Sequence, residues 1–237
     1  MSGHSKWSTI KHKKAANDAV RSGVFTKMAN AIAIAVKKGG GVGDPDMNFS
    51  LRLAVDKARA VSMPKENIQR AIERGMDKGA GADLAELVIE GFAPGGVSVV
   101  ATIVTDSRNR SVSELRNLFE KHGGRMGEPG SVMYQFEACG IVPYNGALSE
   151  DIQLALIDLG MTDVVPDEEG GGTVYTVPDR VHDVVSYLTS AGVDGVEGSL
   201  GYRPKVTASA SNPDTTIAFL EALSDYDDVQ EVYANMA

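Results

Sequence analysis

The sequence predicts a multidomain α+β protein, and three observations lead to this fold class. Hydrophobic residues make up 43% of the 237 residues, which is enough to build packed cores. The first 80 residues show helical periodicity interrupted by glycines, which is typical of a helical bundle. Beyond residue 82, β-branched runs alternate with amphipathic segments, which is typical of sheets covered by helices. We expect an N-terminal all-α helical bundle followed by two ferredoxin-like α+β domains, one inserted in the other.

Four short helices are expected in the bundle, which spans residues 1–80. They cover residues 7–20, 25–38, 47–61 and 64–75. The second helix has one apolar stripe at three- and four-residue spacing, made of Phe25, Met28, Ala29, Ile32, Ala33 and Val36. Asp46 is expected to cap the third helix, and Pro64 fits the first position of the fourth.

The two α+β domains are predicted from the order of their elements. Residues 139–204 give strand, helix, strand, strand, helix, strand, the βαββαβ ferredoxin-like order. Residues 81–138 give only ββαβ, and residues 205–237 supply the missing helix and strand. We therefore expect 139–204 to be inserted into a discontinuous domain made of 81–138 and 205–237. A flexible hinge is expected at residues 78–82.

The elements of the discontinuous domain follow from apolar runs and turn residues. Its strands are expected at 87–92, 97–104, 132–136 and 229–234, and its helices at 111–122 and 214–223. Ser111 and Glu114 have the spacing of a capping box and are expected to begin the first of these helices.

Charge is divided unevenly along the chain. The whole chain has a net charge of −9, whereas residues 5–38 hold eight basic residues and one acidic residue, a net charge of +7. Residues 82–237 have a net charge of −17. A dense basic segment on an acidic protein predicts a surface for a polyanion, most commonly nucleic acid. The acidic domains are expected to face solvent or a basic protein partner.

The candidate nucleic-acid contacts all lie in the helical bundle, and most are cations. They are Lys6, Trp7, Lys11, His12, Lys13, Lys14, Arg21, Lys27, Arg52, Lys65 and Arg70. Lysines are point charges and suit phosphate contacts better than base recognition, so little sequence preference is expected. Two interpretations of Trp7, the only tryptophan, remain open: it stacks on a base, or it packs in the core.

Other motifs give no enzyme or metal site. His4 and His12 lack further ligands at metal-binding spacing. The glycine runs at 39–41 and 170–172 are interpreted as turns, because neither belongs to a phosphate-binding motif. Cys139 is expected to be a small buried residue. No cofactor motif and no converging catalytic group is found, so we predict a protein without catalytic residues, metal or cofactor.

The turn from Asp106 to Arg110 leaves two alternatives open. It joins an expected strand to an expected helix, so its polar side chains can satisfy the free N–H groups of the helix N-terminus. Arg108 and Arg110 beside those N–H groups can equally form a phosphate site.

Short motifs along the whole chain point to a known family. They are Gly3-His4-Ser5-Lys6-Trp7, Lys14-Ala15-Ala16, Phe25-Thr26-Lys27, Pro64-Lys65-Glu66-Asn67-Ile68, Pro94-Gly95-Gly96, Gly130-Ser131-Val132 and Asp228-Val229-Gln230-Glu231-Val232-Tyr233. In this combination the chain resembles the YebC/PmpR family. The chain departs from the family's pattern at Phe92, Ser107 and Ala234, where Tyr, Asn and His are common.

The resemblance implies a helical N-terminal domain, two α+β domains and a non-enzymatic regulator of gene expression. Members are described as DNA-binding transcriptional regulators, and we expect this function, with duplex DNA as the partner. The alternative is a ribosome-associated translation factor that binds ribosomal RNA, as in the related mitochondrial activator of cytochrome oxidase synthesis. A cytoplasmic location without membrane association is expected, because no secretory signal and no membrane-spanning run is found.

Overall fold

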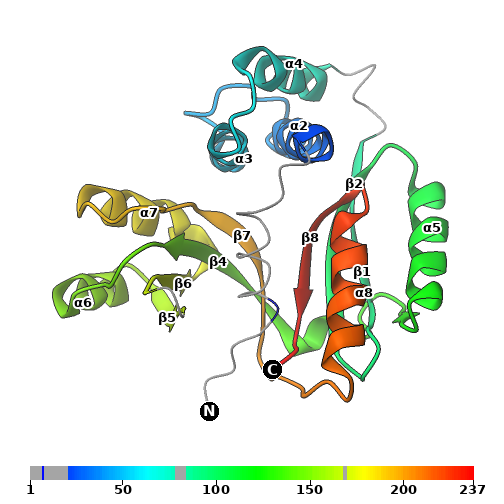
Figure 1. Ribbon diagram of the computed structural model, residues 1–237. Helices are drawn as coiled ribbons and strands as arrows, with labels where there is room; N and C mark the ends of the chain where they lie inside the picture. Colours follow the sequence, from blue (N-terminus) through cyan, green and yellow to red (C-terminus); the bar gives the residue numbers. More distant parts are fainter. Residues whose placement is uncertain (1–6, 8–20, 78–83, 168–169) are drawn as a thin grey trace. The chain divides into compact units, whose positions relative to one another are not determined.

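The computed structural model describes Trp7 and residues 21–77, 84–167 and 170–237 (Figure 1). Its described residues confirm the α+β fold class, with helices first and two four-stranded antiparallel sheets after them. They form two compact units. One is Phe136–Lys205, and the other combines the described part of Ser5–Gln135 with Val206–Ala237.

Three helices are described in the N-terminal region. They are α2 (Arg21–Lys38), α3 (Phe49–Ala60) and α4 (Lys65–Met76). The expected helix at 7–20 lies outside the described residues except for Trp7. The cap of α3 is Asn48 and not Asp46: the Asn48 side-chain oxygen accepts from the Leu51 N–H at 3.1 Å. Asparagine suits position 48 better than aspartate, because the Asn48 amide also donates to the Ala35 carbonyl at 3.1 Å and a carboxylate has no such donor.

Helix α2 is buried on more than one face. Ile32 and Val36 pack with α3 and α4, as the expected stripe predicts. Ala33 and Ile34 pack instead with Leu84 and with Val104 of the first sheet. Every residue from Ile32 to Val36 is therefore buried. A helix that is apolar on all sides must be covered on all sides, so α2 joins the helical region to the sheet.

The first sheet has the strand order β3-β1-β2-β8. Its elements are β1 (Ala85–Phe92), β2 (Ser98–Thr105), α5 (Arg108–Lys121), β3 (Arg125–Met126), α8 (Pro213–Asp225) and β8 (Val229–Ala234). Helices α5 and α8 cover one face (Figure 1), where the Phe119 and Phe219 rings meet edge to face at 4.9 Å. The last strand, β8, pairs antiparallel with β2.

Trp7 belongs to the core of this sheet. Only 2% of its surface is exposed, and it packs among residues of β2, α8 and β8. Its indole N–H donates to the Val232 carbonyl at 3.0 Å. Because β8 is an edge strand, this contact covers part of an otherwise open edge. Of the two interpretations of Trp7, the structure supports packing.

The expected strand at 132–136 is wrong. Met133–Gln135 is a 3-10 helix, and Phe136 begins a strand of the other sheet. The third strand of the first sheet is the short β3. The cause is Glu90, a buried carboxylate that accepts from the N–H groups of Gly130 (2.6 Å), Val132 (2.8 Å) and Met133 (2.8 Å). N–H groups bound to a side chain are not available to a strand ladder.

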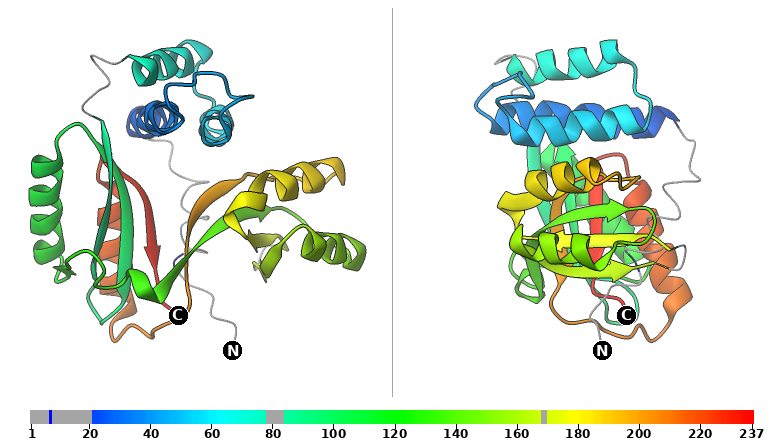
Figure 2. Two further views of the ribbon diagram at one scale, coloured as in Figure 1. Left: turned by 180° about the vertical axis from the view of Figure 1, so that it is seen from behind. Right: turned by 90° about the vertical axis from the view of Figure 1, so that its left-hand side faces the viewer.

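The second unit has the ferredoxin-like strand order β5-β6-β4-β7. Its elements are β4 (Phe136–Tyr144), α6 (Glu150–Asp158), β5 (Met161–Pro166), β6 (Gly172–Thr176), a 3-10 helix (Pro178–Arg180), α7 (Val181–Ser190) and β7 (Ser199–Pro204). Helices α6 and α7 lie on one face of its sheet (Figure 2). Gly140 permits this packing, because a Cβ there would lie 2.2 Å from a Val181 methyl group. The sequence pattern places the last strand of this unit at residues 193–202, but in the structure it begins only at Ser199.

Trp7→Ala is expected to lower the free energy of unfolding by about 3–5 kcal/mol, because it leaves a large cavity in a packed core. Trp7→Phe fills most of that space but leaves the Val232 carbonyl without its donor, so a smaller loss of about 1–3 kcal/mol is expected. Denaturant unfolding of the full chain measures both. An unchanged unfolding midpoint for Trp7→Ala, together with a selective loss of affinity for single strands, would contradict the core assignment.

Glu90→Gln is expected to destabilise the protein in a pH-dependent way. Burial disfavours the carboxylate, but the hydrogen bonds from Gly130, Val132 and Met133 outweigh it and lower the Glu90 pKa below its ordinary 4.5. The carboxylate therefore contributes stability above pH 4.5, and this is lost as pH falls through the lowered pKa. At pH 7 the loss should be about 1.5–3 kcal/mol. Unfolding at several pH values tests this, with exposed Glu120→Gln as control; a difference that is constant from pH 3 to 7 would refute it.

Candidate nucleic-acid interface

Helix α4 separates its apolar and charged residues. Ile68, Ala71 and Ile72 are its buried residues. Arg70 and Arg74 are exposed and four residues apart, which places them on one face of the helix, one turn from each other. The sequence of α4 therefore orders two guanidinium groups along its surface while the apolar side anchors the helix to α2.

The approach of α4 to α2 depends on Gly75. A Cβ at Gly75 would lie 2.6 Å from the Ala33 carbonyl oxygen and 2.7 Å from the Val36 Cβ. Both distances are shorter than van der Waals contact, so only glycine permits this packing. The two helices consequently lie close enough for a side chain of α4 to hydrogen-bond with one of α2.

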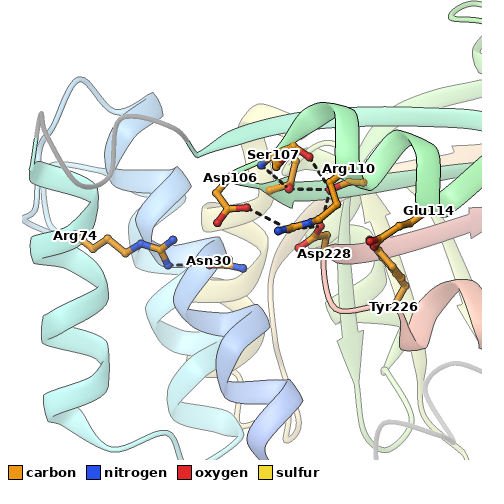
Figure 3. Close-up of polar contacts among 10 residues, drawn as sticks. Asn30, Arg74, Asp106, Ser107, Arg110, Glu114, Tyr226 and Asp228 are labelled. Atoms are coloured by element: carbon orange, nitrogen blue, oxygen red, sulfur yellow. Dashed lines mark hydrogen bonds and ion pairs between the residues drawn. The ribbon is translucent and has the colours of Figure 1, made fainter.

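A groove of about 370 Å³ lies over this helix pair. Polar and cationic side chains line it together with apolar ones. We call it the α4 groove, and it consists of Phe25, Thr26, Ala29, Asn30, Met63, Asn67, Arg70, Ala71 and Arg74. The Arg74 guanidinium donates to the Asn30 side-chain oxygen at 3.0 Å (Figure 3). Asn30 is buried, so it fixes the direction of Arg74.

The Arg70 side chain is available to a ligand. It is 72% exposed, and its ion pair with Glu66 has a long nitrogen–oxygen distance of 3.8 Å. An exposed ion pair of this kind contributes little free energy and yields readily to a stronger partner. Two guanidinium groups one turn apart, each able to donate two parallel hydrogen bonds, suit neighbouring phosphate groups.

The structure describes only part of the predicted contact set. Lys65 and Arg70 are exposed on α4 and agree with a surface role. Arg21 is the first residue of α2, and its side chain lies outside the description. Five predicted contacts lie outside the described residues altogether: Lys6, Lys11, His12, Lys13 and Lys14.

Three predicted contacts are engaged inside the protein. Trp7 is in the core, as described above. The Lys27 ammonium donates to the Ser224 carbonyl at 2.5 Å. The Arg52 guanidinium donates to the Pro45 and Asp46 carbonyls, each at 3.0 Å, and so holds the turn before α3. These side chains stabilise the fold, and we remove them from the proposed contact set.

Four polar residues of the α4 groove were missing from the predicted contacts: Thr26, Asn30, Asn67 and Arg74. The spacing of Arg70 and Arg74 on one helix face could have revealed the second arginine. The role of Asn30 could not have been foreseen, because its contact with Arg74 joins residues 44 positions apart in the chain.

The turn between β2 and α5 forms a polar cluster (Figure 3). The Arg110 guanidinium lies 3.1 Å from an Asp106 carboxylate oxygen and 3.3 Å from one of Asp228. The hydrogen bond and charge of Asp228 raise the pKa of Arg110. For Arg110, the structure thus supports the polar turn over the phosphate site, because two carboxylates already surround its charge.

The predicted capping box at Ser111 is wrong. Helix α5 begins at Arg108, and its N-cap position is Ser107. Ser111 is fully buried, and its hydroxyl donates to Asp228 at 2.6 Å. Glu114 accepts instead from the Tyr226 hydroxyl (Figure 3). A buried hydroxyl needs a partner, and the carboxylate of Asp228 satisfies it from the loop before β8.

Comparison with known proteins assigns the chain to a family. A family model described as the TACO1/YebC protein N-terminal domain matches residues 5–78, and one described as the TACO1/YebC second and third domain matches residues 84–236. The chain belongs to the TACO1/YebC family. The two matches leave residues 79–83 between them, within or beside the expected hinge.

Relatives cover nearly the whole chain. Proteins named "Probable transcriptional regulatory protein" from Thermotoga petrophila and Rubrobacter xylanophilus are 44% and 45% identical to it. Each match spans 99% of this chain, and 93% and 95% of the relative, respectively. A crystal structure titled as a conserved hypothetical protein from Aquifex aeolicus has a TM-score of 0.87 and 39% identity, covering 98% of this chain and 97% of that one.

The described residues offer little to other classes of site. Among them, no group of three or more His, Cys, Asp or Glu side chains is arranged to hold a metal ion. The thiol of Cys139 is buried, and burial raises its pKa to about 12. No helix in the described part of the chain has the length and hydropathy needed to cross a membrane.

Gly75→Ala is expected to disturb the α4 groove by forcing α2 and α4 apart. Overpacking of this kind typically costs about 1–3 kcal/mol of unfolding free energy. Gly23→Ala is the matched control, because a Cβ at Gly23 in α2 meets no atom of the described residues within 4 Å. This control should be neutral or stabilise by up to about 1 kcal/mol. Thermal unfolding of both variants measures the difference, and equal melting temperatures would show that the helices are not in close contact.

Proposed function

We propose that this protein is a non-enzymatic, nucleic-acid-binding regulator of gene expression whose target is duplex DNA. The α4 groove carries the proposal, because it aligns Arg70 and Arg74 on an exposed helix face with Asn67 beside them. The names of the relatives, which describe probable transcriptional regulatory proteins, support the regulatory role.

The proposed mechanism is phosphate binding by the helical region. Arg74, oriented by Asn30, and the exposed Arg70 bind phosphate oxygens through paired N–H groups. Lys65, at the start of the same helix, adds a further positive charge. The segment at residues 5–38 has a net charge of +7, and its basic residues other than Lys27 add further positive charge. Phosphate contacts of this kind give affinity and orientation without reading the base sequence.

Selection of the target is assigned to the second unit. Residues 136–205 contain 12 acidic and three basic residues, a net charge of −9, which equals the net charge of the whole chain. Such a surface repels a phosphate backbone and attracts basic proteins. We propose that this unit docks on a basic protein partner, so that the helical region needs little sequence preference of its own.

The double variant Arg70→Gln/Arg74→Gln is expected to weaken binding to unrelated duplexes by similar factors. Each lost phosphate contact should also reduce the slope of log affinity against log salt by about 0.9. The control is Arg116→Gln/Arg180→Gln, which removes the same charge from exposed positions on α5 and in the second unit. Fluorescence anisotropy at several salt concentrations gives affinity and slope. Equal losses in both double variants would show that the α4 groove is not the contact surface.

A cellular experiment distinguishes the two targets. Chromosomal cross-linking is expected to recover promoter DNA with the protein. Sedimentation of the lysate with ribosomes, insensitive to DNase and abolished by RNase, would instead favour the ribosome-associated translation factor.

A further inference from the structure

A second hollow, of about 540 Å³, lies in the same unit, where the end of α2 meets the starts of β1 and α5. Among the described residues that line it, three are cations and one is acidic. We call it the β1 hollow, and it is lined by Ile34, Lys37, Lys38, Leu84, Ala85, Glu86 and Arg108. None of these residues belongs to the α4 groove. Lys37, Lys38 and Arg108 make the β1 hollow positively charged.

The two lysines of the β1 hollow are held in position. The Lys37 ammonium donates to the Leu84 carbonyl at 2.8 Å. The Lys38 ammonium forms an ion pair with Glu86. Both lie in the last turn of α2, where lysines also offset the partial negative charge of the helix C-terminus. Their position is therefore fixed by the fold, and Glu86 is the ion-pair partner of Lys38.

Arg108 provides the uncompensated charge. It is the first residue of α5, is exposed, and has no hydrogen-bond or ion-pair partner within the described part of the chain. The first turn of α5 contains no acidic residue, and the Ser107 side chain does not cap it. The partial positive charge of this helix end thus adds to the positive field of Arg108 and the lysines.

We propose that the β1 hollow binds a phosphodiester group of a polynucleotide, as a second contact beyond the α4 groove. The inference rests on the proposed function, because the same polynucleotide occupies both sites. An anion fits the excess positive charge, and a phosphate can accept from Arg108 and Lys38 at once. A free nucleotide fits less well, because none of the described residues that line the hollow has an aromatic ring on which a base could stack.

The negative charge of Glu86 allows a test in which the proposal predicts a gain of affinity. Its carboxylate competes with a phosphate for Lys38, and its negative charge repels the phosphate. Glu86→Gln should therefore raise the affinity for duplex DNA, whereas Arg108→Gln should lower it and reduce the salt slope by about 0.9. A merely structural role for the Lys38–Glu86 pair predicts no gain of affinity in Glu86→Gln.

The experiment uses the full chain and a labelled 20-base-pair duplex of arbitrary sequence. The variants are Arg108→Gln and Glu86→Gln, and their charge-matched controls are Arg116→Gln and Glu120→Gln, which are exposed on α5 and do not line the hollow. Affinity and salt slope are measured by anisotropy, and thermal unfolding verifies that each variant is folded. In a separate series, an excess of AMP is added as a free nucleotide that can compete with the duplex.

The proposal is supported if Arg108→Gln lowers and Glu86→Gln raises the affinity for the duplex, each by more than its control. AMP should then fail to compete at millimolar concentration. If Arg108→Gln and Glu86→Gln match their controls while Arg70→Gln/Arg74→Gln still weakens binding, the hollow is excluded and the proposed function stands. If the wild-type chain binds no duplex and no structured RNA, the proposed function itself fails. AMP binding that is lost in Arg108→Gln, without any change for the duplex, would assign the hollow to a free nucleotide and overturn the proposal.

Discussion

The burial of α2 on more than one face is the constraint on which both candidate sites depend. Five consecutive residues, Ile32 to Val36, are buried because α3 and α4 cover one side and the first sheet covers another. One wall of the α4 groove is α2, and its last turn supplies the lysines of the β1 hollow. Because α2 is fixed by packing on more than one side, the backbone positions of the residues that it contributes to both sites are also fixed.

Several basic side chains of the helical region stabilise this arrangement and do not face a ligand. Lys27 binds a carbonyl at the end of α8, and Lys57 forms an ion pair with Glu231 of β8 at 3.1 Å. Charge density along the sequence therefore overstates the surface available to a polyanion. Among the described residues, the cations proposed for a ligand lie on the exposed side of α4, in the last turn of α2 and at the start of α5.

The sequence predicted the fold class and most helices, because these depend on local periodicity and on element order. It failed where a buried polar group has a distant partner. Glu90 binds three N–H groups about 40 residues away and converts an expected strand into a turn. Ser111 binds Asp228, 117 residues away, and so cannot cap a helix. The two alternatives for Trp7 could be decided only by its contact with Val232.

The most direct test of the central claim observes the arginine side chains themselves. Titration of the ¹⁵N-labelled full chain with duplex DNA can be followed by the NMR signals of the arginine Nε–Hε groups, assigned by single substitutions. The account predicts that the signals of Arg70, Arg74 and Arg108 shift together, whereas those of Arg180 and Arg203 in the acidic unit stay in place. Shifts confined to Arg180 and Arg203, or binding without any change at Arg70 and Arg74, would contradict it.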